Sequence, residues 1–300
     1  MTLLSPAPAP GPVLDLLAGR RFVALTGAGL STDSGIPDYR GPGSPARQPM
    51  TYGDFVSGPE AQQRYWARSH LGWSRMRRAE PNPGHHALTA LEATGRVPLL
   101  ITQNVDGLHE AAGSRAVCAL HGRIADVICL GCREQTSRTR LHARLGELNP
   151  GWADAHADVA VRPDGDVDLD DTAGFVVPPC ESCGGVLKPD VVFFGENVPK
   201  PRVERCYAAV EALDPETEAL VVLGSSLTVM SGLRFVRRAA QRAVPVVIVN
   251  RGPTRGDPLA TLTLHHGTSE FLRLLCAELS ETTVAMTTAS SDKSAGDPQI

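Results

Sequence analysis

The sequence predicts an α/β fold in which a doubly wound parallel sheet carries a smaller inserted domain. Four apolar runs of the kind that form buried parallel strands occur at 22–25, 97–101, 220–223 and 244–249. Helical patterns separate them, and two close cysteine pairs lie in the long stretch between the second and third runs. Alternation of such strands with helices is typical of a doubly wound sheet, and the stretch with the cysteines is part of the insertion.

Length and composition support a large globular core and exclude several classes of protein. The chain has 300 residues, of which 42% are hydrophobic, enough for one large domain or two. A net charge of -4 argues against non-specific binding of nucleic acid, which needs a basic surface. No apolar run approaches the roughly 20 residues that cross a bilayer, and residues 1–12 resemble neither a signal peptide nor a transit peptide. We therefore expect a cytoplasmic protein without nucleic-acid or membrane partners.

The first strand ends in a turn with the character of a phosphate-binding loop. A short helix at 13–17 leads into this strand, and Gly27 and Gly29 follow it, where glycines let a backbone approach a pyrophosphate closely. An ordinary tight turn is the alternative, because Thr32 takes the place of the usual third glycine and no acidic residue closes a second strand. The next segment is too polar for a core helix and too specific for a linker. It consists of Gly35, Ile36, Pro37, Asp38, Tyr39 and Arg40.

The stretch 52–78 has apolar and aromatic residues at helical spacing. Its aromatic residues favour a buried helical module over an aromatic binding site. A second helix is expected at 87–94, preceded by His85 and His86. These histidines are expected to cap and pack, because no cysteine or carboxylate lies at ligand spacing from them.

Polar side chains follow the strand at 97–101 and the strand-like run at 117–120. Gln103, Asn104 and Asp106 come after the first, and His121 comes after the second. Polar residues at the carboxyl ends of strands in a doubly wound sheet face the ligand crevice. A lone histidine in this position is more often structural, but the neighbouring polar cluster favours a catalytic role for His121.

The cysteine pairs indicate a metal site. Cys129 and Cys132 form one Cys-x-x-Cys pair, and Cys180 and Cys183 form the other. Each pair places two thiolates on one turn, and four thiolates are the ligand set of a tetrahedral zinc. Because four sulfurs fill the coordination sphere, we expect one structural zinc per chain and reject a catalytic one. Such a metal supplies folding free energy to a small module.

The motifs, in their order and spacing, resemble those of the sirtuins, the NAD-dependent protein-lysine deacylases. They lie at 27–31, 35–40, 103–106, 121–122, 188–196, 224–227 and 249–250. The resemblance covers residues 13–275, nearly the whole predicted fold. It implies a Rossmann-like NAD-binding domain made of 13–45, 96–126 and 186–280.

The remaining segments complete the predicted organisation. The smaller domain comprises a helical module at 46–95 and a zinc-binding module at 127–185. Residues 1–12 are expected to be a flexible tail and 281–300 a disordered tail, since their composition is poor in large apolar residues. In the last part of the fold, a helix is expected at 232–243, strands at 257–260 and 262–264, and a closing helix at 269–279.

The resemblance implies that NAD is consumed as a co-substrate. An acyl-lysine amide is a poor electrophile, so water does not attack it readily. Nicotinamide is a good leaving group, and the amide oxygen can therefore attack the ribose carbon that nicotinamide leaves, giving an alkylamidate intermediate. His121 is then the general base that takes a proton relayed from the ribose hydroxyls. Nicotinamide and O-acyl-ADP-ribose are the expected products. The catalytic residues implied are His121, Asn104 and Asp106.

The same resemblance implies residues that hold the co-substrate. Asn104 and Asp106 line the nicotinamide pocket, and Gln103 holds the ribose. Asp38 and Arg40 help order the cofactor loop, and Tyr39 shields the reacting carbon from water. The cofactor-binding residues implied are Gly27, Ala28, Gly29, Ser31, Asp38, Tyr39, Arg40, Gln103, Asn104, Asp106, Gly224, Ser225, Ser226, Asn250 and, at the adenine, Thr268.

An acyl-lysine protein or peptide is the implied substrate. It would add as a strand between 192–196 and 226–230, a mode of binding that depends on main-chain hydrogen bonds. The substrate-binding residues implied are Val191, Val192, Phe193, Gly195, Glu196, Leu227 and Val229. Family members that favour charged acyl groups carry a Tyr-x-x-Arg pair, whereas Arg47 has no tyrosine three residues before it. Neutral acyl groups are therefore expected: acetyl, longer aliphatic or lipoyl-like.

Several alternatives remain open at this stage. The long gap between the cysteine pairs resembles the class II branch that includes a lipoamidase-type sirtuin, and an aspartate-rich run at 164–171 lies within it. A solvated face is favoured for that run over a calcium site, because the EF-hand spacing is missing. Protein mono-ADP-ribosyl transfer, delipoylation and a zinc-knuckle interaction module without turnover are the alternative functions. An NAD dehydrogenase is disfavoured, and a monomer is favoured over an oligomer.

Overall fold

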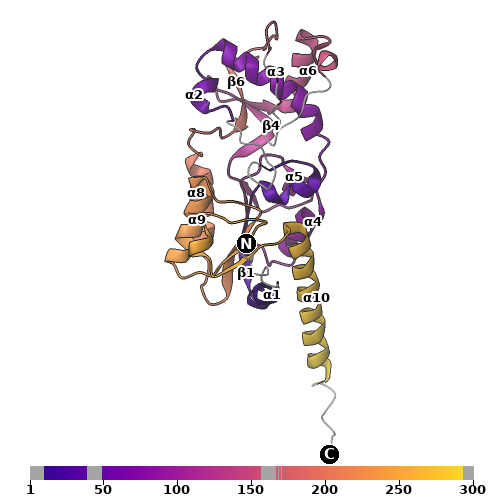
Figure 1. Cartoon of the computed structure of the whole chain (residues 1–300), viewed down its shortest axis with the longest axis vertical. Coiled ribbons are helices and arrows are strands. Elements are labelled where there is room, and N and C mark those ends of the chain that lie inside the picture. The colour runs from indigo at the N-terminus through magenta and orange to yellow at the C-terminus, as the bar shows by residue number, and fades with distance from the viewer. Residues whose placement is uncertain (1–9, 39–48, 157–166, 168, 170, 293–300) are drawn as a thin grey trace, which may run out of the picture.

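The computed structural model describes residues 10–38, 49–156, 167, 169 and 171–292, without the side chains of 75 and 281–292. The molecule is elongated, with the larger sheet-containing lobe at one end and a smaller lobe at the other (Figure 1). The helix α10 (Thr268–Asp292) extends away from the larger lobe. Within the described residues, no helix has the length and apolar character needed to span a bilayer.

The larger lobe is built on one parallel sheet of six strands. The strand order is β3-β2-β1-β7-β8-β9, and every neighbouring pair is parallel. The strand bounds are β1 (Arg21–Thr26), β2 (Leu100–Thr102), β3 (Val117–Ala119), β7 (Glu218–Leu223), β8 (Val246–Val249) and β9 (Leu262–Leu264). The order reverses direction between β1 and β7, which is the point where an open α/β sheet binds ligands beyond its carboxyl ends.

Helices cover both faces of this sheet, as the sequence predicts. One face carries α1 (Gly11–Ala18), α4 (Pro83–Ala93) and α10 (Thr268–Asp292), and the other carries α8 (Lys200–Glu211) and α9 (Met230–Gln241). Alternate residues of β1 point to opposite faces, so Phe22 and Ala24 join one core and Val23 and Leu25 the other. Burial on both faces explains why the strands are continuous apolar runs.

The smaller lobe has one core, to which residues of the predicted helical and zinc modules both contribute. The helix α4 lies within the predicted helical module, 46–95, but packs on the larger sheet. The sheet of the smaller lobe has the order β5-β4-β6 and is antiparallel. The elements of this lobe are α2 (Tyr52–Phe55), α3 (Pro59–Met76), β4 (Gly122–Cys129), β5 (Gln135–Ser137), α6 (Arg138–Leu148), α7 (Trp152–Ala155) and β6 (Leu187–Val191). Phe55 and Trp66 of the helical module pack with Leu145 and Phe175 of the zinc module. The aromatic residues of 52–78 thus form core, in agreement with the favoured interpretation.

Several predicted elements differ in type or bounds from the structure. Pro98 has no N–H to donate, and the strand predicted from 97 begins only at Leu100. The segment predicted as a strand at 257–260 is the 3-10 helix η3 (Asp257–Leu259), because the Asp257 carboxylate accepts from the Thr254 N–H at 2.9 Å and bends the chain. The helix predicted from 87 begins at Pro83, and the helix predicted from 232 begins at Met230.

The last helix is longer than predicted. α10 continues past residue 279 to Asp292, so the disordered tail predicted from 281 is wrong for the backbone up to that point. No glycine or proline interrupts 268–292, and nothing local therefore ends the helix. The rest of that tail, 293–300, lies outside the described residues, as do 1–9 of the predicted N-terminal tail.

Candidate functional site

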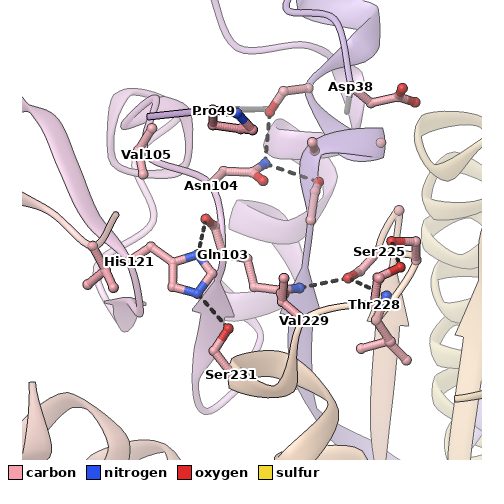
Figure 2. A pocket seen from close by; sticks show the side chains of 18 of the residues that line it. Asp38, Pro49, Gln103, Asn104, Val105, His121, Ser225, Thr228, Val229 and Ser231 are labelled. Atoms are coloured by element: carbon pink, nitrogen blue, oxygen red, sulfur yellow. Dashed lines mark hydrogen bonds between the residues drawn. The ribbon is translucent and has the colours of Figure 1, made fainter. Parts of the chain in front are cut away.

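A cavity of about 1150 Å³ lies beyond the carboxyl ends of the parallel strands, between the two lobes. Figure 2 shows side chains that converge on it from β2, β3 and the start of α9. Every predicted catalytic, cofactor-binding and substrate-binding residue that the structure describes lines this cavity. They are Gly27, Ala28, Gly29, Ser31, Asp38, Gln103, Asn104, Asp106, His121, Val191, Val192, Phe193, Gly195, Glu196, Gly224, Ser225, Ser226, Leu227, Val229, Asn250 and Thr268. Tyr39 and Arg40 lie outside the described residues.

The turns after β1 and β7 touch through glycines. The Gly29 N–H donates to the Gly224 carbonyl at 2.8 Å, and a Cβ on Gly27 would lie 2.7 Å from the same oxygen. Gly224 has φ +64, a left-handed conformation that favours glycine. The two turns therefore meet as bare backbone at the point where the strand order reverses. A diphosphate fits such a place because N–H groups can approach it without side chains in the way.

A hydrogen-bonded chain fixes the polar side chains beneath this turn. Asn104 Nδ2 donates to the Gly27 carbonyl at 3.1 Å and to Ser31 Oγ at 3.0 Å (Figure 2). The Ser31 hydroxyl donates to Asp106 Oδ2 at 2.7 Å, and Oδ1 of that carboxylate accepts from the Leu108 N–H at 3.0 Å. Burial raises the pKa of Asp106 above its ordinary value, and these hydrogen bonds oppose the rise. The amide and carboxylate are thus held in place without a bound ligand.

His121 is held at both ring nitrogens. Its Nδ1 lies 2.9 Å from the Gln103 carbonyl oxygen, and its Nε2 lies 2.8 Å from Ser231 Oγ (Figure 2). A carbonyl oxygen only accepts, so Nδ1 carries the proton and Nε2 keeps its lone pair. Burial lowers the pKa of His121, against the opposing effect of the Gln103 carbonyl. The imidazole is therefore neutral near pH 7 and can accept a proton from a group in the cavity.

Gln103 connects the ends of β1 and β7 across the cavity floor. Its Nε2 donates to Ser225 Oγ at 2.7 Å and to the Thr26 carbonyl at 3.4 Å. At the far end, Asn250 donates to the Gly252 carbonyl at 2.8 Å, which orders the loop after β8. These contacts extend the polar lining from His121 towards the end of β8, as a ligand of dinucleotide length requires.

The segment after β6 forms the wall beside His121. The Val192 N–H donates to the His121 carbonyl at 2.8 Å. The Lys188 ammonium is buried and lies 2.9 Å from Glu196 Oε2, which also accepts from the Phe193 N–H at 2.9 Å. Burial lowers the pKa of Lys188, and Glu196 opposes this. The buried ion pair therefore ties the loop 193–196 to β6.

The four predicted metal ligands lie together. Each offers one sulfur, and the sulfurs of Cys129, Cys132, Cys180 and Cys183 all lie within 4.8 Å of one another. Two of the Sγ to Sγ distances are 3.5 Å and 3.8 Å. A Zn–S length of about 2.3 Å in a tetrahedron sets the sulfurs about 3.8 Å apart, so the site fits one structural zinc. Four thiolates leave no open position, which excludes this metal from catalysis on a substrate.

Comparison with known proteins identifies the family. A family model described as the Sir2 family matches residues 27–231. The chain belongs to the Sir2 family, the sirtuins. A relative from Mycobacterium avium (strain 104), called NAD-dependent protein deacetylase 1, is 55% identical over 268 residues, covering 88% of this chain and 94% of the relative. The NAD-dependent protein deacetylase of Xanthomonas axonopodis pv. citri (strain 306) is 53% identical over 262 residues, covering 86% and 87%.

Solved sirtuin structures share the fold. A structure described as Sir2, p53 peptide and NAD+ has a TM-score of 0.72 and 31% identity, over 90% of this chain and 98% of that one. A structure of Sir2 bound to an acetylated peptide has a TM-score of 0.68 and 30% identity, over the same fractions. Both are similar to this sirtuin over its two lobes.

Sequence reasoning missed several residues that line the cavity of this sirtuin. They are Pro49, Met50, Tyr65, Ser231, Arg234, Arg251 and His266. Tyr65 was expected only as core, and it is 8% exposed at the edge of the cavity. Ser231 had a usable signal, because it is a polar residue in the segment that follows the end of β7, where side chains face the ligand crevice. The pairing of Lys188 with Glu196 had no signal beyond their shared motif.

Proposed function

We propose that this sirtuin is an NAD-dependent protein-lysine deacylase. It transfers the acyl group of acyl-lysine to ADP-ribose and releases nicotinamide and O-acyl-ADP-ribose. One observation carries the proposal: the unprotonated Nε2 of His121 faces the same cavity as the glycine turns after β1 and β7. The names of the bacterial relatives as NAD-dependent protein deacetylases support it.

NAD supplies, when bound, a ribose carbon that loses nicotinamide readily, so that an otherwise inert amide oxygen can attack it. In the proposed site, Gly29 and Gly224 hold the diphosphate, and Gln103 holds the ribose next to nicotinamide. The fixed amide of Asn104 and carboxylate of Asp106 bind nicotinamide. Asp38 and Arg40 are proposed to order the loop over the co-substrate, and Tyr39 to shield the reacting carbon from water. The remaining contacts are proposed to come from Ala28, Ser31, Ser225, Ser226, Asn250 and Thr268.

His121 is the proposed general base. Its lone pair at Nε2 takes the proton of a ribose hydroxyl, and a base positioned in this way contributes about 10²–10⁴-fold in rate. Protonation is opposed by burial, so the base is free at neutral pH. Within the neutral form, the Gln103 carbonyl selects the tautomer that carries its proton on Nδ1.

The peptide is proposed to bind between 192–196 and 226–230. Both segments line the cavity and lie outside the two sheets of the described residues. Phe194 already pairs with Thr51, and the Ser226 carbonyl already accepts from the Arg255 N–H, so an added strand would use the remaining main-chain groups. The Val192 carbonyl is the proposed acceptor for the N–H of the acyl-lysine amide. Phe193, Leu227 and Val229 would then contact the lysine stem.

We propose that the acyl group removed from lysine is neutral. More specifically, we propose that the chain belongs to the class II branch of the sirtuins and accepts lipoyl-like groups. The helical module contributes Pro49, Met50 and Tyr65 to the cavity wall, all uncharged. The residue Arg47 and most of the aspartate-rich run at 164–171 lie outside the described residues. Peptides with acyl groups of different length therefore test which acyl chain the site accepts.

The test is incubation with NAD and acetyl-, octanoyl-, lipoyl- and succinyl-lysine peptides, followed by mass spectrometry. We expect nicotinamide, free lysine peptide and O-acyl-ADP-ribose with the neutral acyl groups, and about 10² or more loss of deacylation in His121→Ala. A protein that gains ADP-ribose while the peptide stays acylated would replace this proposal by mono-ADP-ribosyl transfer. Unchanged deacylation in His121→Ala would remove His121 from the mechanism.

A further inference from the structure

The first turn of α9 reaches the candidate base. Ser231 Oγ lies 2.8 Å from His121 Nε2, and the two side chains point toward each other (Figure 2). Because Nδ1 donates to the Gln103 carbonyl, Nε2 accepts and the Ser231 hydroxyl donates. The ring is therefore clamped between a backbone carbonyl on one side and a side-chain hydroxyl on the other.

The helix α9, which carries Ser231, is held in place by the sheet and by Gln103. Leu233, Phe235 and Val236 of α9 are fully or almost fully buried against the sheet. A Cβ on Gly232 would lie 2.6 Å from Gln103 Oε1, so the helix packs directly on the Gln103 side chain. Gln103 thus contacts His121 through its carbonyl and the start of α9 through its side chain. This arrangement sets the distance between Ser231 and the imidazole.

We propose that Ser231 is a positioning residue for the base, its hydroxyl holding the His121 ring with Nε2 turned into the cavity. The proposal rests on the proposed deacylase function and adds a residue to it. In the base step, the Ser231 hydroxyl first turns its hydrogen away from the one lone pair of Nε2. The ribose O–H bond then breaks, the ribose oxygen keeps the electron pair, and the proton forms the Nε2–H bond. The imidazolium then donates to the Ser231 oxygen, which changes from donor to acceptor.

The arginines around His121 disfavour its protonated ring, so the hydrogen bond between Ser231 and that ring matters for the base step. Arg202 of α8 and Arg234 of α9 both disfavour the imidazolium, and Asp190 of β6 partly offsets Arg202 through an ion pair of 3.0 Å. A hydroxyl binds a charged imidazolium more strongly than a neutral ring. Loss of the Ser231 hydroxyl therefore lowers the pKa of His121 further and weakens the base.

The test compares the wild type, Ser231→Ala and Ser231→Thr. NMR of the histidine ring nitrogens across pH measures the His121 pKa in the unliganded full chain. Kinetics measure two steps, the exchange of labelled nicotinamide into NAD, which does not use the base, and the formation of deacylated peptide, which does. Alanine is a good helix former and Ser231 makes no helix cap, so α9 is expected to stay folded.

We expect Ser231→Ala to lower the His121 pKa by about half to one unit. Deacylation should fall about 3–30-fold with exchange changed less than about twofold. Ser231→Thr should restore both readouts. An unchanged pKa, unchanged deacylation, or an equal loss of both steps would each overturn the proposal. A wild type that releases no nicotinamide would instead refute the deacylase function, while the pKa comparison would still decide whether Ser231 supports His121.

Discussion

Gly232 packs against Gln103 so closely that a Cβ at position 232 would lie 2.6 Å from Oε1 of the amide. Gln103 also donates to Ser225 and accepts from His121, so one side chain and its backbone link three parts of the cavity. The absence of a side chain at Gly232 is what allows this link.

Gly232→Ala is therefore expected to displace Gln103 and to raise KM for NAD about tenfold, with a smaller effect on KM for the peptide. Steady-state kinetics with each substrate varied in turn measure this. The control is Gly11→Ala, because a Cβ there would contact nothing within 4 Å. Equal KM values for NAD in the two variants would contradict the prediction.

The buried pair of Lys188 and Glu196 is expected to control the peptide side of the site. Lys188→Met keeps the volume but removes the ammonium that holds Glu196 and the Val191 carbonyl. We expect KM for the peptide to rise about 5–20-fold with KM for NAD nearly unchanged, since the freed loop 193–196 forms one wall of the peptide site. The control is Lys200→Met, whose ion pair with Glu204 is exposed. A rise in KM for NAD instead would assign the loop to the co-substrate.

Zinc removal is expected to unfold the smaller lobe first. Cys129 and Cys180 are buried in the core that also contains Trp66 and Leu145, so the metal and the core support each other. Cys132→Ser should lose the one bound zinc, measured by elemental analysis, and lower Tm by about 10 °C or more. Cys276→Ser, which alters a cysteine of the larger lobe, is the control. Retention of zinc with a native Tm in Cys132→Ser would contradict a four-thiolate site.

Acid is expected to destabilise the fold through buried histidines. Burial lowers the pKa of His85 to about 4 and of His109 to about 3, from an ordinary 6.5. His109 Nε2 lies 3.0 Å from Thr26 Oγ1, and the ring centroids of His85 and His109 are 4.8 Å apart. As pH falls below 6.5, the unfolded chain takes up these protons before the folded chain does, so stability present above pH 6.5 is lost progressively towards pH 4.

His109→Gln should reduce the slope of unfolding free energy against pH by about 1.4 kcal/mol per unit in that window. Urea denaturation at a series of pH values measures it. The exposed His265→Gln is the control. The same slope in His109→Gln and the wild type would show that His109 does not titrate in this way.

The Arg138 guanidinium lies 5.1 Å from the Trp66 ring and 5.2 Å from the Trp73 ring, in the core of the smaller lobe. Its Nη2 donates to the Ser69 carbonyl at 3.0 Å, and burial lowers its pKa to about 10. Arg138→Ala should lower the free energy of unfolding by about 3 kcal/mol because it leaves a cavity, whereas Arg138→Met should stay within about 1 kcal/mol of wild type. Urea denaturation compares them. Equal losses would show that the charge, and not the volume, supports the core.

The predictable part of the fold is the part with a local signal. The strands β1, β7 and β8 are continuous apolar runs, which the sequence shows directly. The start of α4 was predicted too late, at 87, although Asn82 is of a residue type that prefers the N-cap. The end of α10 was missed because helix termination beyond 279 had no glycine or proline to mark it. The 3-10 turn at 257–259 was missed because Asp257 acts on Thr254 through a hydrogen bond that periodicity does not record.

The sequence by itself determined the apolar strand runs, the glycine turns and the two cysteine pairs, because each depends on neighbours in the chain. The tertiary structure alone decided which ring nitrogen of His121 keeps a lone pair, since the Gln103 carbonyl and Ser231 hydroxyl come from different parts of the fold. It likewise decided the pairing of Lys188 with Glu196 and the contact of Gly232 with Gln103. Hydrogen bonds and packing depend on distances of a few tenths of an ångström, which only the folded chain sets.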